Sequence, residues 1–298
     1  MNPVTKRHDK DSFFKYYTAA SAQITLENAT RKWSTPFLFN DPFDNQFDLY
    51  FEEPSEALAA ENLARFQRIV TSPEPIKDNQ FGSRTDDVRL IQQVHLQNPD
   101  FQYTEEEMAY LLEGEIEGMQ QTVNIMPEIN ADLRSKMADT SIFCLSETHD
   151  NLLMWSHYAQ HHTGAVIKFL ALPEVDSPLI VAQPVRYTSQ VPRLTFSRLM
   201  DFDAALRETL NTITLTKSEV WAYEREWRIV TTLRDKAQAH EILPFAPEEV
   251  GAVYLGCKID ENDKNEIIAI TRRKYPQAKI FQAEKHEREF ALAFRDIT

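Results

Sequence analysis

Glycine is scarce in this chain, and its scarcity limits the folds that the chain can adopt. Only 6 of the 298 residues are glycine, whereas average usage would be roughly 7% of a chain. They stand at Gly82, Gly114, Gly118, Gly164, Gly251 and Gly256. No two of them fit the G-x-G-x-x-G pattern or a Walker loop, in which glycine backbone wraps around phosphate. The sequence therefore excludes a Rossmann or P-loop cradle, and any nucleotide would be held by side chains and helix ends.

The charge balance argues against a nucleic-acid partner. The chain carries 32 basic and 46 acidic residues, a net charge of −14, and such a chain does not attract a phosphate backbone. No apolar run reaches the ~18 residues that a membrane span needs. The opening MNPVTKRHDKD lacks the apolar core of an export signal. The two cysteines, Cys144 and Cys257, are typical of reduced thiols. We therefore expect a cytoplasmic protein without a membrane partner.

The stretch from Ser141 to Phe169 contains a dense group of candidate site residues. An apolar run that ends at Ser146 and another that begins at Ala165 predict two strands. Leu152–Gln160, between them, is rich in helix formers. A strand, a short helix and a strand would bring polar and aromatic side chains to a crevice beside the strand ends. These side chains are Trp155, Ser156, His157 and Tyr158.

An aromatic run near the N-terminus, Phe13–Thr18, has the character of a strand. Because side chains alternate along a strand, Lys15 and Tyr17 are expected on the face opposite to Phe14 and Tyr16. Lys15 and Tyr17 are therefore candidate site residues.

A turn follows this strand and a short helix. Ser21 is expected to cap a helix that runs to about Ala29, and Trp33–Phe39 is expected to be extended because it contains a proline. The next residues, Asn40-Asp41-Pro42, favour a turn, since an Asp before a proline is pushed out of the α region. The turn is either a rigid corner or a binding loop, and Asn40 and Asp41 are its candidate binding residues.

The segment Pro54–Ala138 differs from the rest because nearly all of it favours helix. Helices are predicted at Ser55–Thr71, Asp86–Gln97, Thr104–Asn124 and Pro127–Met137. Later in the chain we expect an extended segment at Pro178–Tyr187 and helices at Phe202–Leu215 and Asn262–Arg273. We predict an α+β protein whose mixed or antiparallel sheet comes from both ends of the chain, residues 1–53 and 139–298. Residues 54–138 are predicted to be a helical insertion packed beside it, as a subdomain or lid.

Two acidic residues stand at the mouth of a predicted strand. In an extended segment Glu224 and Glu226 would share a face with Arg228. Two carboxylates this close can raise each other's pKa or divide binding and catalysis between them. The alternative is a structural ion pair with Arg228 or with a helix opposite.

Two histidines show a metal-like spacing. His157 and His161 stand at i and i+4, which suits a metal on one face of a helix. The chain has no H-E-x-x-H motif and no pair of neighbouring cysteines, and His161 is expected beyond the end of the helix. We therefore expect no metal, and His157 is predicted to act as an acid, a base or a hydrogen-bond donor.

Several segments form a recognisable set. In chain order they are FNDPFD (Phe39–Asp44), CLSE with LLMWSHYA and HHTGAVIKF (Cys144–Phe169), VRY (Val185–Tyr187) and W-x-YEREWRIV (Trp221–Val230). The leading KYYT and the late VYLGCKI (Val253–Ile259) belong to it as well. Together they resemble the bacterial family called domain of unknown function 2971. The resemblance covers both ends of the chain and skips the helical block, and the name of the family implies no activity.

The order of these elements also looks like the skeleton of ADP-ribosyltransferases. A strand with a polar residue between aromatics is followed by a helix and, much later, by an acidic-x-acidic strand. This likeness implies binding of NAD without a Rossmann loop, with Glu226 facing the ribosyl cation as nicotinamide leaves. The first motif of those enzymes uses Arg or His, where this chain has Lys15. Their middle motif is matched here only by Ser146 or Tyr158.

Three functions follow from these patterns. The first is an NAD-consuming transferase or glycohydrolase, with Glu226, Glu224 and His157 catalytic and no cofactor required besides NAD as substrate. The second is a non-enzymatic sensor of a nucleotide or a protein in a defence or toxin module. The third is a metal-dependent hydrolase that uses His157 and His161. Aromatic side chains would stack on nicotinamide or adenine, and Lys15 or Arg228 would hold phosphate. The predicted binding residues are Lys15, Tyr17, Asn40, Asp41, Trp155, Ser156, Tyr158, Tyr187 and Arg228.

Overall fold

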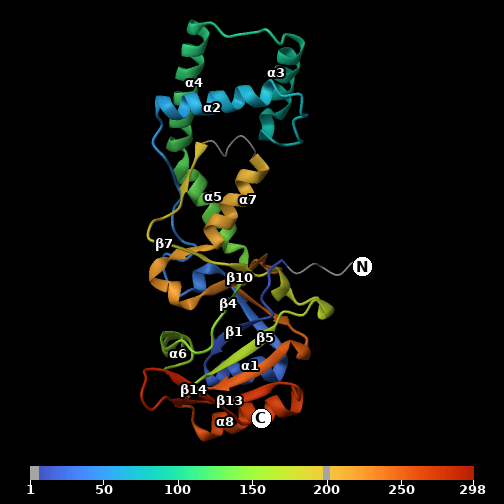
Figure 1. The fold of residues 1–298 in the computed structure, drawn as a ribbon, viewed down its shortest axis with the longest axis vertical. Helices are drawn as coiled ribbons and strands as arrows, with labels where there is room; N and C mark the ends of the chain where they lie inside the picture. Colours follow the sequence, from blue (N-terminus) through green and yellow to red (C-terminus); the bar gives the residue numbers. More distant parts are fainter. Residues whose placement is uncertain (1–6, 197–201) are drawn as a thin grey trace. The chain divides into compact units, whose positions relative to one another are not determined.

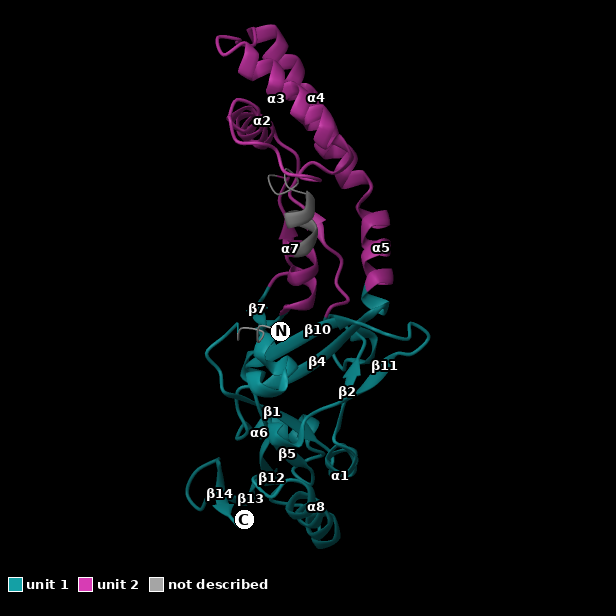
Figure 2. Ribbon diagram, turned by 90° about the vertical axis from the view of Figure 1, so that its right-hand side faces the viewer, with its two compact units in different colours: residues 1–44, 137–189, 217–298 teal, residues 45–136, 190–216 magenta. Residues whose placement is uncertain are grey.

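The computed structural model describes residues 7–196 and 202–298, which divide into two compact units (Figure 2). The first unit comprises residues 1–44, 137–189 and 217–298, and the second comprises residues 45–136 and 190–216. The second unit thus includes residues 190–216 in addition to most of the helical block predicted at 54–138. Residues 1–6 lie outside the described residues. They make up the first part of MNPVTKRHDKD, the segment that was expected not to be an export signal.

A large sheet forms the centre of the first unit (Figure 1). Its strands are β1 (Ser12–Tyr17), β2 (Thr30–Ser34), β4 (Thr140–Ser146), β5 (Ala165–Leu170), β6 (Gln183–Pro184), β10 (Glu226–Thr232), β11 (His240–Pro244), β12 (Val250–Leu255), β13 (Lys279–Lys285) and β14 (Leu292–Asp296). They follow the order β11-β2-β4-β1-β5-β12-β13-β14, and β10 pairs with β4 and β6. Strands β12 and β13 are parallel and are connected by helix α8 (Glu261–Lys274), whereas the neighbouring pairs are antiparallel. The predicted α+β class with a mixed, mostly antiparallel sheet is confirmed.

Three adjacent strands, β1, β4 and β10, bring the two ends of the chain together. Phe14 of β1 pairs with Ser146 at the end of β4, and Ser146 also pairs with Glu226 at the start of β10. Lys15, next to Phe14, and Glu226 are therefore close in space although most of the chain separates them in sequence.

Polar side chains cap the helices of the first unit. Helix α1 (Ala19–Asn28) is capped by Thr18, whose side-chain oxygen accepts a hydrogen bond from the Ser21 backbone N–H, so the cap predicted at Ser21 lies three residues earlier. Helix α6 (Leu152–Tyr158) starts after Asn151, which accepts from two backbone N–H groups of its first turn. Asp260 caps α8 in the same way. The short helix predicted between β4 and β5 is therefore present.

The two faces of the sheet carry separate apolar clusters. Phe13 and Tyr17 belong to one cluster, and Phe14 and Tyr16 belong to the other. Strand β1 thus alternates as its sequence predicted. Trp155, at the centre of α6, is fully buried in the second cluster.

Two segments predicted to be extended contain 3-10 turns instead. Strand β2 ends at Ser34 and is followed by a 3-10 turn at Pro36–Leu38, and another turn covers Pro178–Val181. In both, the proline occupies the first helical turn, where its fixed φ and missing N–H cause no loss. The remainder of the second segment forms β6 and β7 (Arg186–Thr188), and β7 pairs with β9 (Thr216–Ser218). Other 3-10 turns in the described residues are Gly82–Arg84, Pro173–Val175, Glu219–Glu224 and Pro247–Glu249.

The second unit contains the helices predicted between residues 54 and 138. They are α2 (Glu56–Val70), α3 (Thr85–Gln97), α4 (Glu105–Asn124) and α5 (Met126–Ala138), and α7 (Phe202–Thr214) follows later in the chain. Thr104 begins α4 in a capping box with Glu107. Two short strands, β3 (Tyr50–Phe51) and β8 (Arg193–Leu194), pair in parallel. None of the described helices is long and apolar enough to cross a membrane.

Gly164→Ala is expected to lower the free energy of unfolding by about 2 kcal/mol or more. A Cβ on Gly164 would lie 2.0 Å from the Tyr17 carbonyl oxygen and 3.1 Å from that of Ala159, so the backbone would have to move. Gly118→Ala in α4 is the matched control, because a Cβ there meets nothing within 4 Å and alanine gains up to about 1 kcal/mol in helix propensity. Urea unfolding followed by circular dichroism measures both variants. A Gly164→Ala protein as stable as wild type would contradict the clash.

Candidate functional site

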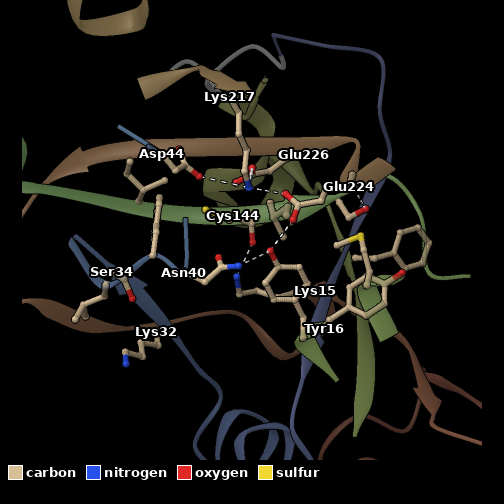
Figure 3. A pocket seen from close by; sticks show the side chains of 18 residues that line it. Lys15, Tyr16, Lys32, Ser34, Asn40, Asp44, Cys144, Lys217, Glu224 and Glu226 are labelled. Atoms are coloured by element: carbon tan, nitrogen blue, oxygen red, sulfur yellow. Dashed lines mark hydrogen bonds and ion pairs between the residues drawn. The ribbon is translucent and has the colours of Figure 1, made fainter. Parts of the chain in front are cut away.

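A pocket of about 320 Å³ opens in the first unit beside the ends of β1, β4 and β10 (Figure 3). One part of its wall is apolar, with Phe14, Leu38, Phe39, Ile142, Leu145 and Met154. The other part is polar or charged, with Lys15, Lys32, Ser34, Asn40, Asp44, Ser146, Tyr158, Lys217, Glu224 and Glu226. Five of the predicted site residues line this one pocket: Lys15, Asn40, Tyr158, Glu224 and Glu226.

A turn, not a strand, places Glu224 in the pocket. Residues Glu219–Glu224 form a 3-10 turn, and Arg225 takes a left-handed conformation with φ of 44°. Strand β10 therefore begins only at Glu226. The prediction that Glu224 lies on one extended face with Glu226 and Arg228 is wrong for Glu224, because the left-handed residue redirects the chain before the strand starts.

Glu226 is held by buried cations. Its two carboxylate oxygens accept hydrogen bonds from Arg228, at 2.8 Å from Nε and 2.9 Å from Nη2, and Lys217 Nζ lies 3.1 Å from Oε2. Arg228 also donates to Asp44 at 2.7 Å, and Lys217 lies 3.4 Å from the same carboxylate oxygen. Figure 3 shows Lys217 among the three acids. All of these side chains are at most 6% exposed. Charges this deeply buried stay ionised only because each has an opposite partner.

These contacts shift the pKa values of the two glutamates in opposite directions. Burial would raise the pKa of Glu226, but Arg228 and Lys217 outweigh it and hold that pKa well below 4.5. The pKa of Glu224 is raised, chiefly by burial, which Lys217 offsets only in part, and Glu226 repels its charge. Burial disfavours the charge of Lys217, yet Glu226, Asp44 and Glu224 together raise its pKa. Glu224 is thus the acid that takes up a proton more readily.

Glu224 is shared between a cation and a phenol. Lys217 donates to its Oε2 at 2.6 Å, and the Tyr158 hydroxyl donates to its Oε1 at 2.6 Å. Asn40 Nδ2 lies 3.5 Å from the Tyr158 oxygen. Burial, and then the negative charge of Glu224, raise the pKa of Tyr158, so the phenol keeps its proton. This chain of polar groups runs from the buried ion network to exposed Asn40.

Lys15 is one of three lysines that line the pocket, and it forms no ion pair with a carboxylate among the described residues. Its ammonium donates to the Cys144 carbonyl at 2.6 Å and lies 4.7 Å from the centre of the Phe143 ring. Burial lowers its pKa. An ammonium has three donors, so Lys15 retains donor capacity that a ligand in the pocket can use.

Four predicted site residues do not line the pocket. Trp155 is buried, and its indole N–H donates to the His149 carbonyl at 2.7 Å. Tyr17 is buried in the core cluster that also contains Phe13. Asp41 accepts from the Phe43 backbone N–H at 2.9 Å and so closes the turn. Arg228 is fully buried in the ion network described above.

Three others also lie outside the lining. Ser156 is partly buried in α6, and His157 is exposed, with its ring 6.2 Å from those of Tyr158 and Trp221. The Tyr187 hydroxyl accepts the Glu226 backbone N–H at 2.8 Å, so Tyr187 positions the start of β10. His161 lies beyond the end of α6 with φ of 57°, as the sequence suggested.

Sequence reasoning missed Asp44 and Lys217. Asp44 is the last residue of the FNDPFD motif, but the turn chemistry of that motif points to Asn40 and Asp41 instead. Lys217 stands in the short strand β9, with no local pattern that marks it. The signal available was the excess of acid nearby, since Glu224 and Glu226 need a second buried cation besides Arg228.

The described residues contain no group of three or more His, Cys, Asp or Glu side chains arranged to hold a metal ion. The acids of the pocket are occupied instead by Lys217 and Arg228. His157 lies in a helix and His161 in a left-handed turn, so the helical spacing that suggested a metal does not hold between them.

Arg228→Met is expected to lower the free energy of unfolding by about 3–5 kcal/mol, because it removes one of the two buried cations that balance Glu226 and Asp44. Arg295→Met is the matched control. Arg295 donates to Glu284 at 2.7 Å, but both side chains are about half exposed, and such pairs contribute at most about 1 kcal/mol. If urea unfolding showed that both variants lose the same free energy of unfolding, burial of the ion network would not contribute to stability.

The depressed pKa of Glu226 predicts acid sensitivity. A group whose pKa is lower in the folded than in the unfolded protein stabilises the fold above its unfolded pKa, here about 4.5. That stabilisation is lost as the pH falls below this value towards the folded pKa. The stability difference between wild type and Glu226→Gln should therefore shrink as the pH is lowered from 4.5. Denaturant titrations at several pH values measure it, and a difference that stays constant would contradict the assignment.

Comparison with known proteins adds one match. Residues 154–229 match the model of a family described as "Protein of unknown function (DUF2971)". No curated protein and no solved structure matches the chain. The matched segment includes Tyr158, Lys217 and both pocket glutamates. The resemblance that the motifs suggested is therefore confirmed over residues 154–229, where the chain is similar to the family of unknown function DUF2971.

Proposed function

We propose that the pocket binds NAD and cleaves its bond to nicotinamide, as a glycohydrolase or as an ADP-ribosyltransferase-like enzyme. The observation that carries the proposal is the convergence of Lys15, Tyr158 and Glu224 on one cavity from three separate parts of the chain. Several polar side chains line the cavity, which agrees with a chain that has no glycine cradle for a nucleotide.

The lining suits one end of a dinucleotide. A cavity of about 320 Å³ is near the lower limit for small-molecule sites, so it would take the nicotinamide ribose and leave the phosphates outside. Phe14, Leu145 and Met154 offer an apolar surface for the ring. Lys32 lines the pocket, is exposed and forms no ion pair with a described carboxylate, so its ammonium is available to a phosphate.

Glu224 is the better candidate for the reacting carboxylate. Glu226 is bound by two cations, Arg228 and Lys217. Glu224 is bound by one cation, Lys217, and by the neutral hydroxyl of Tyr158, so less of its charge is compensated. Glu224 has a raised pKa, which suits a base that accepts a proton during the reaction. As the C–N bond breaks, its electrons leave with nicotinamide and positive charge develops on the ribose, which Glu224 stabilises. Water or an acceptor hydroxyl then bonds to that carbon and gives its proton to Glu224.

A sensor that binds a nucleotide without reaction is the second candidate. The observation that favours it is the complete pairing of Asp44, Lys217, Glu226 and Arg228, which makes a rigid wall and leaves one acid for chemistry. A role for such a sensor in a defence or toxin module stays a prediction.

Glu224→Gln is expected to reduce nicotinamide release from NAD by roughly 10²-fold or more, because one electrostatic contact at the reacting centre is lost. Tyr158→Phe should reduce it less, since the variant loses only the hydroxyl that contacts Glu224 and Asn40 and keeps both carboxylates. His157→Ala is the control and should stay near wild type, because His157 is exposed and outside the pocket. Thermal melting of each variant separates loss of activity from loss of fold.

The assay is run with and without cell lysate as a source of acceptors. Binding of NAD without release under either condition would replace the enzyme with the sensor. Absence of NAD binding to the wild-type protein would end the NAD proposal altogether.

A further inference from the structure

A second cavity, of about 600 Å³, lies in the first unit beside the connection between β13 and β14. Its lining shares no residue with the first pocket and includes His162, Cys257, Lys258 and residues 285–292. Neither the family match nor the proposed function gives it a role.

The walls of this cavity are held by close backbone contacts. The His162 carbonyl accepts the Lys258 backbone N–H at 3.0 Å, and the Gly256 N–H donates to Gly164 at 2.9 Å. A Cβ on Gly256 would lie 2.1 Å from the His162 oxygen, so only glycine permits this approach. The β13–β14 connection is closed by the His286 N–H, which donates to the Ala291 carbonyl at 3.0 Å. The two loops are therefore fixed on each side of the cavity.

The segment that carries His162 is unusual. Gln160, His161 and His162 all have positive φ, at 48°, 57° and 71°, which non-glycine residues seldom adopt in succession. The His162 ring lies parallel to Trp155, at 7° and 6.1 Å between centroids. Its Nδ1 is buried and has no hydrogen-bond partner in the described part of the chain. Sparsely populated backbone conformations persist where the surrounding structure holds them, often at binding sites.

Basic side chains of the lining have no acidic partner. Lys258, Lys285 and Arg288 all line the cavity, and none forms an ion pair with a described carboxylate. Glu287 and Glu289 line it too, so cations outnumber acids here although the chain as a whole carries −14. An excess of unpaired ammonium and guanidinium groups around a hollow favours an anion, and guanidinium in particular suits phosphate.

Apolar side chains complete the site. Leu152, Leu292 and Phe290 contribute to the lining, and the Phe290 side chain is fully exposed. An aromatic ring open to solvent offers a stacking surface for a flat ligand. A volume of about 600 Å³ is ordinary for a small-molecule site.

We propose that this cavity is a second binding site, which takes a nucleoside phosphate with its phosphate on Lys258 and Arg288 and its base against Phe290.

Cys257 supplies a direct reporter, because it lines this cavity whereas the other cysteine, Cys144, lines the first pocket. The native protein is treated with N-ethylmaleimide, and mass spectrometry follows alkylation of each cysteine peptide. AMP is expected to slow alkylation of Cys257 by about tenfold near saturation and to leave Cys144 unchanged. Adenosine and inorganic phosphate at the same concentration should protect Cys257 much less, since each provides half of the contacts.

The double variant Lys258→Gln/Arg288→Gln should lose the protection by AMP. Lys236→Gln is the matched control, because Lys236 is an exposed lysine outside the cavity, paired with Asp139, and it should keep the protection. The proposal is overturned if AMP does not slow alkylation of Cys257, or if the double variant is protected as well as wild type. Equal protection by adenosine, or by inorganic phosphate, would also overturn it. Isothermal titration with AMP checks the loss of binding in the double variant independently.

Discussion

Five ionised side chains share the buried end of the first pocket, and the position of its walls depends on their mutual pairing. They are Asp44 and four residues of the segment 217–228, namely Lys217, Glu224, Glu226 and Arg228. Each charge would be costly if it were buried alone. The loop that ends at Asp44 and the strand that contains Lys217 must therefore close on β10 together. The network also explains why three acids meet at one site: they pair with Lys217 and Arg228. No group of acids, histidines or cysteines among the described residues is arranged to hold a metal ion.

The same pairing separates the chemistry of the two glutamates. Arg228 and Lys217 lower the pKa of Glu226 against the effect of burial, whereas burial dominates at Glu224 and raises its pKa. Neighbouring acids with pKa values pushed apart are the usual basis for a division of roles. Glu226 binds Lys217 and Arg228. Glu224 is hydrogen-bonded to Tyr158, and both of these residues line the pocket in which a ligand would lie.

Local patterns predicted the elements well and the site less well. The alternation of β1, the helix at Leu152–Tyr158 and the helices of the second unit follow from periodicity and caps, which are local properties. Lys217 could not be found that way, because no periodicity or cap marks it and its third partner, Asp44, is distant in the sequence. Glu224 was expected in a strand because nothing in the sequence marks Arg225 as left-handed. Trp155 was expected in a crevice, yet it packs edge-on against Tyr16 inside a buried cluster.

One short segment of the chain links the walls of both cavities. Tyr158 ends α6 and faces the first pocket, and His162, four residues later, lines the second. Gln160 and His161, between them, have positive φ, so no helix connects the two residues. Gly164 lies so close to Tyr17 of β1 that a Cβ there would clash with the Tyr17 carbonyl oxygen. Because β1 also carries Lys15, the positions of Lys15, Tyr158 and His162 are set by the same contacts. In a chain with so few glycines, the one at Gly164 is explained by its neighbours: a Cβ there would meet the carbonyl oxygens of Tyr17 and Ala159, so the backbone passes between them only without a side chain.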